Sequence, residues 1–143
     1  MRDFQIGEII FMLDAGLDDE PVQNEAMILS IDESKKFLHV VVTKTKGWIN
    51  LALKDYQHTF FDTAEEADQV VKKLPQPNAT VYRIKDKQIV TQVTKGVDFI
   101  PRKNGTCELA VIFDFATMDY SLVREFGKNM FCSKAEAEMH IGM

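Results

Sequence analysis

The sequence predicts an α+β fold that is mostly antiparallel β, arranged as two tandem SH3-like modules of curled sheet that each end in a short helix. Three observations predict this fold. β-branched and aromatic residues gather in runs of strand length, clusters of turn-forming residues separate the runs, and one helix-start pattern occurs twice, at Thr63 and at Ser133.

In the first half, strands are expected at residues 8–13, 23–31, 36–43 and 48–53. The runs Ile9-Ile10-Phe11 and Val40-Val41-Val42-Thr43 favour strand over helix, because branched and aromatic side chains suit a pleated surface. The clusters Asp32-Glu33-Ser34-Lys35 and Lys46-Gly47 indicate turns between these strands.

In the second half, strands are expected at residues 80–84, 88–95, 108–115 and 120–124, with a turn at Lys103-Asn104-Gly105. The segment Leu74-Pro75-Gln76-Pro77-Asn78 is the natural junction, since its prolines stop the preceding helix. We therefore expect two modules, at residues 1–74 and 75–143.

The repeated pattern is a capping box. Thr63-Ala64-Glu65-Glu66 and Ser133-Lys134-Ala135-Glu136 each place a hydroxyl at the N-cap and a glutamate three residues later. The hydroxyl accepts the glutamate's backbone N–H, and the carboxylate reaches back to the cap amide. Each box is expected to open a helix, one ending near residue 73 and the other near residue 141. We call the separation along the chain from Thr63 to Ser133 the repeat interval.

Upstream of the boxes the two halves match less closely. When the sequence is aligned with itself at the repeat interval, residues 40–42 match residues 110–112. With small gaps, Ile9-Ile10-Phe11 corresponds to Thr80-Val81-Tyr82, and Ser30-Ile31-Asp32 to Gly96-Val97-Asp98. Modules of half this length bury little surface, so they are expected to pack on each other or on a second chain, as in a homodimer.

Composition favours a protein of the cytoplasm. The chain has 143 residues, of which 45% are hydrophobic and 27% charged, and no apolar run reaches the roughly 18 residues of a membrane span. Its first residues lack the apolar region of a signal peptide. Cys107 and Cys132 are too few for a disulfide framework or a zinc site, and both are expected to be reduced.

Charge is distributed unevenly along the chain. Residues 1–74 contain 8 basic and 14 acidic residues (8 − 14 = −6), and residues 75–143 contain 9 and 8 (+1), which gives the net charge of −5. An acidic half favours a protein partner with a basic surface over direct binding of nucleic acid. The candidate partner-binding residues are the acidic side chains Asp14, Asp18, Asp19, Glu20 and Glu25.

No catalytic, cofactor-binding or metal-binding set is identifiable. His39, His58 and His140 lack metal-ligand spacing, and Asp18-Asp19-Glu20 lacks the alternating ligands and central glycine of a calcium loop. Phosphate-loop and nucleophile-elbow motifs are missing. Cys132 precedes a helix start, where a thiolate is stabilised, but an ordinary thiol is the preferred interpretation. The aromatic residues Trp48, Tyr56, Phe60 and Phe61 are expected in the core rather than in base stacking.

Two segments resemble short uncharacterised proteins of Firmicutes prophages and other mobile elements. The opening Ile6-Gly7-Glu8-Ile9-Ile10 resembles the Ile-Gly-x-x-Val strand of that family. The segment from Phe60 to Ala67, and more weakly the one from Met130 to Ala137, resemble its closing Val-Phe-Leu-Thr-x-Glu-Glu-Ala helix. The second copy departs from the pattern at Cys132 and Ala135. The resemblance implies a fold type and a mobile-element setting, and it carries no implication about activity.

The leading functional hypothesis is therefore a non-enzymatic protein-binding accessory protein of a phage or mobile element, acting in the host cytoplasm without a cofactor. One alternative is an anti-defence inhibitor, such as an anti-CRISPR protein, that binds a host nuclease complex through its acidic surface. Another is a small nucleic-acid-binding barrel that uses the basic residues of the second half: Lys85, Lys87, Arg102, Lys103 and Lys128.

Overall fold

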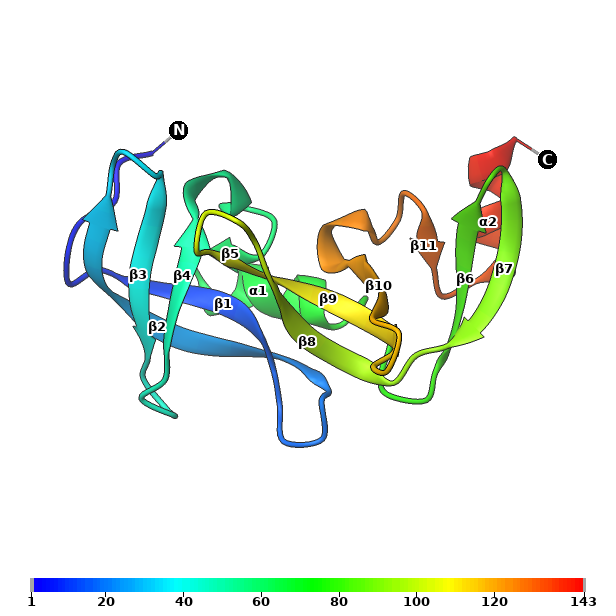
Figure 1. Cartoon of the computed structure of the whole chain (residues 1–143), viewed down its shortest axis with the longest axis horizontal. Helices are drawn as coiled ribbons and strands as arrows, with labels where there is room; N and C mark the ends of the chain where they lie inside the picture. Colours follow the sequence, from blue (N-terminus) through cyan, green and yellow to red (C-terminus); the bar gives the residue numbers. More distant parts are fainter. Residues whose placement is uncertain (1, 143) are drawn as a thin grey trace.

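β-branched and aromatic runs form antiparallel strands through most of residues 2–142, the part of the chain that the computed structural model describes (Figure 1). The first half contains β1 (Ile9–Ala15), β2 (Pro21–Asp32), β3 (Phe37–Val42), β4 (Trp48–Ala52), the 3-10 helix η1 (Leu53–Asp55), β5 (Phe60–Phe61) and α1 (Ala64–Val71). Its strands make one sheet in the order β4-β3-β2-β1-β5. All four long strands lie close to their predicted bounds.

The second half contains β6 (Thr80–Lys85), β7 (Gln88–Val93), β8 (Gly96–Pro101), β9 (Cys107–Asp114), β10 (Asp119–Leu122), the 3-10 helix η2 (Val123–Glu125), β11 (Met130–Phe131) and α2 (Lys134–Ile141). These strands form two three-stranded sheets, β10-β9-β8 and β11-β6-β7. The fold is thus mostly antiparallel β with two short helices, as predicted.

The sequence analysis missed β8, and the predicted strand over residues 88–95 extends too far, since β7 ends at Val93. Pairing within the β6–β7 hairpin ends before Thr94. The fully buried Thr94 hydroxyl donates to the Ile112 carbonyl oxygen (2.9 Å) and accepts a hydrogen bond from the Gly96 amide (3.1 Å). Where the first half has the single long strand β2, the second half therefore has two strands in different sheets.

The predicted repeat interval holds through the end of each half. The 3-10 helices η1 and η2, the short strands β5 and β11, and the helices α1 and α2 each begin one repeat interval apart. A parallel bridge joins Tyr56 to Phe60 in the first half and Phe126 to Met130 in the second. The two chain segments that close the halves therefore follow the same path.

Strand pairing also tests the weaker matches. Phe11 pairs with Phe61 and Tyr82 with Phe131, so the correspondence of residues 9–11 with 80–82 is confirmed. The predicted match of residues 40–42 with residues 110–112 is wrong by three positions along the chain. Ala52 and Leu122 each precede a 3-10 helix and so correspond to each other. Ala52 pairs with Phe37 and Leu122 pairs with Ala110, so residue 37, rather than residue 40, corresponds to residue 110.

Both helices start at the predicted caps. Thr63 Oγ1 accepts the Glu66 amide at 3.2 Å, and Ser133 Oγ accepts the Glu136 amide at 3.4 Å. The return bond from glutamate to the cap amide does not form within residues 2–142. The Thr63 hydroxyl instead donates to Glu66 Oε1 at 3.0 Å. Only the hydroxyl half of each capping box is therefore confirmed.

Two hydrophobic clusters hold the chain together. One fills the inside of the curled five-stranded sheet and contains Phe60. The other contains Phe61 and lies between the halves, because it combines Leu13 and Leu74 with residues of the second half such as Val111. β1 lies between the clusters: Ile10 and Met12 belong to the first and Leu13 to the second. The halves, side by side in Figure 1, thus share a core.

Candidate partner-binding surface

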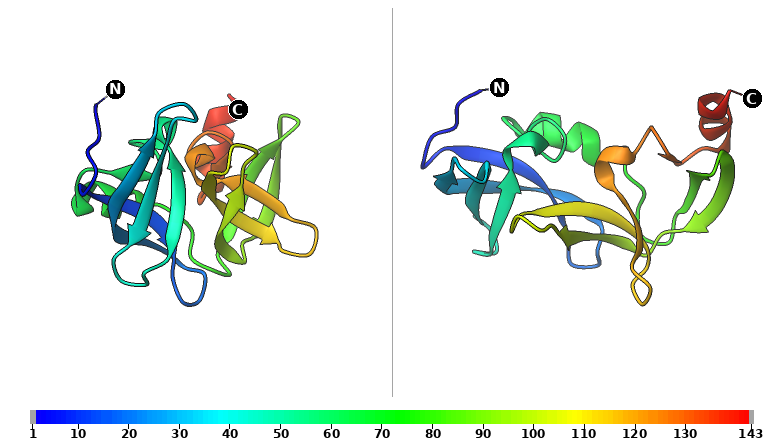
Figure 2. Two further views of the ribbon diagram at one scale, coloured as in Figure 1. Left: turned by 60° about the vertical axis from the view of Figure 1, so that its left-hand side comes forward. Right: turned by 45° about the horizontal axis from the view of Figure 1, so that its top comes forward.

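Three hairpin turns extend beyond their strands. Two of them, β1–β2 and β3–β4, point to the lower side in Figure 1 and in the left view of Figure 2, and the third, β9–β10, points to the right in that left view. They connect β1 to β2 (residues 16–20), β3 to β4 (residues 43–47) and β9 to β10 (residues 115–118). We call the surface formed by these turns and Trp48 the hairpin-tip face. It contains residues from both halves of the chain.

The β1–β2 turn gathers three of the five acidic candidates, Asp18, Asp19 and Glu20. Asp18 and Asp19 are exposed, and the Glu20 carboxylate accepts the Asp18 amide at 3.0 Å. Beside them Leu17 has a relative exposure of 101%, the highest among the exposed large hydrophobic residues. An apolar side chain in the middle of an acidic turn has no role in the core, so it is available to a partner.

The two other acidic candidates lie outside this turn. Asp14, on β1, is half-buried and accepts hydrogen bonds from the Ala15 amide (2.7 Å) and from Asn24 Nδ2 (2.8 Å). Glu25 is exposed on β2, and its carbonyl oxygen accepts the Thr43 amide at 3.0 Å, so it lies at the base of the β3–β4 turn. Glu25 is thus close to the hairpin-tip face, whereas Asp14 is held by neighbours in its own sheet.

Trp48 begins β4 and is 72% exposed, so its predicted place in the core is wrong. Phe60 and Phe61 are buried, and Tyr56 is half-buried. The indole lies edge-on to the His39 ring at 5.8 Å, and His39 Nδ1 lies 2.6 Å from Asn50 Oδ1. Trp48 is therefore a supported aromatic side chain on the surface, the kind that anchors protein interfaces.

The β9–β10 turn adds a third apolar group. Phe115 and Met118 are 42% and 46% exposed, and Asp114 Oδ1 stabilises the turn by accepting the Ala116 amide at 2.9 Å. Leu17, Trp48, Phe115 and Met118 are thus distributed over the three turns of the hairpin-tip face. Apolar anchors beside charged residues are typical of interfaces between proteins.

The remaining candidates for chemistry do not come together. Among residues 2–142, no group of three His, Cys, Asp or Glu side chains is placed to hold a metal ion. His140 packs against the Phe131 ring, with ring centroids 5.4 Å apart. Burial and the charge of Glu136 raise the pKa of Cys132, which opposes the formation of a reactive thiolate.

A buried ion-pair network, which the sequence analysis did not anticipate, joins the halves. Asp55 and Glu108 are 0% and 2% exposed, and each pairs with both Arg102 and Arg124. Arg102 donates to the two oxygens of Asp55 at 3.0 and 3.2 Å. The network therefore ties η1 of the first half to the β8–β9 region and η2 of the second.

Two of the five basic residues proposed for nucleic-acid binding are paired with acidic residues of the same chain. Arg102 belongs to the buried network, and Lys85 lies 3.9 Å from Asp119. Asp119 also accepts Arg83 (3.0 Å) and Gln92 (3.2 Å). The second half consequently presents fewer free cations than its sequence suggests.

The comparisons with known proteins leave the family open. A scan against known protein-family models found no match, and a search of curated proteins found none either. No helix within residues 2–142 has the length and apolar character needed to span a membrane.

Proposed function

We propose that this chain is a non-enzymatic accessory protein of a phage or mobile element. It binds a host or phage protein in the cytoplasm through the hairpin-tip face. The observation that carries the proposal is the set of exposed anchors Leu17, Trp48, Phe115 and Met118, which lie in or next to the three hairpin turns. A few residues, most often tryptophan, tyrosine or arginine, contribute most of the binding energy of a protein interface, and Trp48 is of this type.

The acidic turn favours a partner with a basic surface. Asp18, Asp19 and Glu20 surround Leu17, so an apolar pocket bordered by arginine or lysine would match the turn in shape and charge. A host nuclease complex has such a surface where it holds nucleic acid, and an anti-defence inhibitor is the narrower form of the proposal. Direct binding of nucleic acid is less favoured, because Arg102 and Lys85 are paired within the chain.

We also propose that the two halves, at residues 1–74 and 75–143, are diverged copies of one small SH3-like unit. The constant repeat interval between equivalent 3-10 helices, short strands and α-helices supports this origin. Divergence then accounts for the single sheet of the first half and the two sheets of the second. Only one of the copies carries the acidic turn and Trp48.

The test is affinity capture with wild-type protein and three single variants. Leu17→Ser and Trp48→Ala remove anchors of the hairpin-tip face. Met139→Ala is the matched control, because Met139 is equally apolar and 77% exposed but lies on α2. Host-cell lysates are passed over each immobilised protein, and bound proteins are quantified by mass spectrometry.

We expect one protein or complex to be retained by the wild type and by Met139→Ala, and to be reduced about tenfold or more by either anchor variant. Retention should also fall as salt is raised, because the acidic turn contributes. Equal retention by all four proteins, or turnover of a metabolite by the wild type, would contradict the proposal.

A further inference from the structure

The strand β7 forms a sheet edge with which no other segment of residues 2–142 pairs. β7 stands last in the order β11-β6-β7, and in Figure 1 it is the outermost strand, at the right-hand side of the molecule. Unpaired N–H and C=O groups on a sheet edge are a template for a further strand. The edge of β7 is therefore a candidate binding site, separate from the hairpin-tip face.

Strand pairing identifies the backbone groups of β7 that face outward. In an antiparallel ladder, successive residues bond alternately to the two sides. The Ile84 amide donates to the Asn129 carbonyl oxygen at 2.9 Å, on the β11 side, so Ile84 bonds away from β7. Its cross-strand partner Ile89 consequently bonds away from β6, and so do Thr91 and Val93. The N–H and C=O groups of these three residues form no hydrogen bond within residues 2–142.

The corresponding strand of the first half has a neighbour on this side. Phe11, which corresponds to Tyr82, pairs with Glu25. Tyr82 pairs with Thr91, so Glu25 and Thr91 correspond to each other. The Glu25 carbonyl oxygen accepts the Thr43 amide at 3.0 Å, and the outer edge of β2 pairs with β3. In the second half, β9 corresponds to β3 but pairs with β8 and β10. β7 has therefore lost the outer neighbour that β2 keeps.

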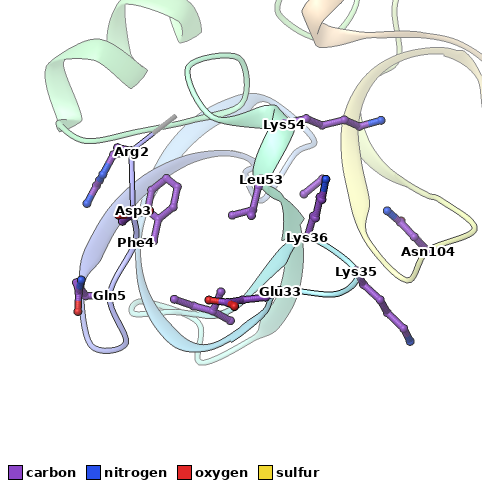
Figure 3. Close-up of a pocket in the computed structure, with 12 residues that line it drawn as sticks. Arg2, Asp3, Phe4, Gln5, Glu33, Lys35, Lys36, Leu53, Lys54 and Asn104 are labelled. Atoms are coloured by element: carbon purple, nitrogen blue, oxygen red, sulfur yellow. The ribbon is translucent and has the colours of Figure 1, made fainter.

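The edge strand β4 of the first sheet is covered, in contrast to β7. Asn50 Nδ2 donates to the Gly105 carbonyl oxygen at 3.2 Å, which brings the β8–β9 loop beside β4. Figure 3 shows this loop, with Asn104, next to a hollow of about 960 Å³ at the end of the curled sheet. The hollow is lined by charges of both signs, such as Asp3 and Lys36, and so selects no class of ligand. β7 lacks the cover that β4 has.

β7 also lacks the features that usually protect an edge strand. Natural edges carry charged side chains, prolines or bulges. Residues 88–93 contain no charged residue and no proline, and their pairing with β6 runs without a register shift. Lys95 has already left the strand, since its amide donates to the Ile112 carbonyl oxygen at 2.7 Å. Two identical copies of β7 can therefore meet without like charges facing each other.

A two-fold antiparallel pairing centred on Thr91 satisfies all the outward groups. Thr91 then faces Thr91 of the second copy, and Ile89 faces Val93 of the second copy. Centring the pairing on a neighbouring residue would leave the outward groups at one end of β7 without partners. Val93 is 48% exposed, so its side chain gains an apolar cross-strand neighbour. The edge is thus complementary to itself.

The helices leave room for this pairing. α2 packs against all three strands of its sheet, so it is centred near β6, the middle strand. The two copies of β6 would lie three strand spacings apart, or about 14 Å. Helices in contact have axes about 8–10 Å apart. The two copies of α2 would therefore lie on the same face of the joined sheet without a clash.

We infer that β7 pairs antiparallel with β7 of a second copy of this chain, with Thr91 at the two-fold axis. The two three-stranded sheets then form one continuous sheet. This interface goes beyond the proposed partner binding and contains none of the hairpin-tip residues. Contact between two short strands buries less than the roughly 1,200 Å² of a stable interface, so we expect a transient dimer with a Kd on the order of 100 μM.

Sedimentation equilibrium of the full chain, from about 10 μM to about 1 mM, tests the inference. Thr91→Lys and Thr91→Glu each place like charges opposite each other at the two-fold axis. Thr80→Lys is the matched control, because Thr80 is also an exposed threonine. It lies on the same face of the sheet, opposite Val93, but on β6 instead of the edge strand.

The wild type and Thr80→Lys are expected to associate alike as the concentration rises. Thr91→Lys and Thr91→Glu should each associate about tenfold more weakly or less, because like charges directly opposite each other repel. An equimolar mixture of the two should associate at least as tightly as the wild type, since lysine then faces glutamate. This recovery would also show that both variants fold. In the wild type, hydrogen exchange at the amides of Ile89, Thr91 and Val93 should slow as the dimer forms.

Three results would overturn the inference: a wild type that keeps the mass of one chain throughout, equal weakening by Thr91→Lys and Thr80→Lys, or a mixture that associates no better than its components. Leu17→Ser should associate like the wild type, because Leu17 is not part of β7. Failure of dimerisation would leave partner capture by the hairpin-tip face untouched. Failure of capture would, in turn, leave the dimer unchanged.

Discussion

Replacing Asp55 by asparagine should destabilise the protein far more than the same change at the equivalent position of the second half. Asp55 has no solvent exposure and accepts three N–H donors, two from Arg102 and one from Arg124. Asp55→Asn keeps the volume but removes the charge. Both guanidinium groups then face a single carboxylate, that of Glu108.

The size of the effect follows from burial. Removing one partner of a buried ion pair costs about 3–5 kcal/mol, because a charge is left without compensation. The lower end applies here, since the side chains of Arg102 and Arg124 keep 19% and 25% of their exposure and turn partly to water. We therefore expect a loss of about 3 kcal/mol, or a melting temperature roughly 10 °C lower for a chain of this size.

Urea unfolding followed by circular dichroism measures this loss, and Glu125→Gln is the control. Glu125 is the equivalent of Asp55 in η2, but it is half-buried, and within residues 2–142 its carboxylate accepts a hydrogen bond only from Asn129 Nδ2, at 2.8 Å. Its replacement should change the unfolding free energy by no more than about 0.5 kcal/mol. If the two variants differ by less than about 1 kcal/mol, the value of an exposed pair, the network does not join the halves as argued.

Three further predictions test other contacts. Gly96→Ala should destabilise by about 2–4 kcal/mol in the same urea assay, since the new Cβ would lie 2.6 Å from the Asp19 carbonyl oxygen. Gly105→Ala, also at a positive φ (87° against 130° at Gly96) but in open space, should cost only about 1–2 kcal/mol, and equal losses would argue against the contact. Burial alone would raise the pKa of Asp119, but hydrogen bonds from Arg83 and Gln92 outweigh it and lower the pKa. Asp119→Asn should therefore lower the free energy of unfolding by about 1–2 kcal/mol at pH 7. The difference from the wild type should shrink as the pH falls below about 4, because the wild-type carboxylate is then protonated as well. A difference that does not change with pH would refute this. Cys132 should react with iodoacetamide more slowly at pH 7 than glutathione does, because its raised pKa leaves little thiolate, and a faster reaction would contradict that cause.

Local patterns were sufficient to predict the fold class and most elements. The caps at Thr63 and Ser133 depend only on residues within one helical turn, and both form. The first-half strands alternate in burial, as β3 does with Leu38, Val40 and Val42 inside, so period-two patterning locates them. These features could be predicted because their causes lie within a few residues of sequence.

The split of the second sheet could not be predicted locally. Besides the hydrogen bonds of Thr94, the split is accompanied by a contact with the first half, where the Val97 amide donates to the Asp19 carbonyl oxygen at 2.8 Å. Gly96, with φ of 130°, lets that carbonyl approach. The β1–β2 turn is therefore both part of the hairpin-tip face and a contact between the halves, and only the folded chain brings Asp19 to β8.

The buried network left a signal that sequence reasoning did not use. Glu108 is a lone charge in the otherwise apolar segment Cys107-Glu108-Leu109-Ala110-Val111, and a charge inside a buried strand requires a partner. That rule predicts that a cation lies nearby, but several arginines and lysines qualify. Which of them pairs with Glu108 depends on how the halves pack, and no interval in the sequence encodes that choice.

The network also shows how two related halves form a specific, non-symmetric contact. In the 3-10 helix of each half, a basic residue is followed directly by an acidic one: Lys54-Asp55 in η1 and Arg124-Glu125 in η2. The first half contributes its acid and the second its base to one ion pair, Asp55 with Arg124. The other members, Lys54 and Glu125, remain outside the network. Equivalent positions thus have different roles, so the interface between the halves joins unlike surfaces.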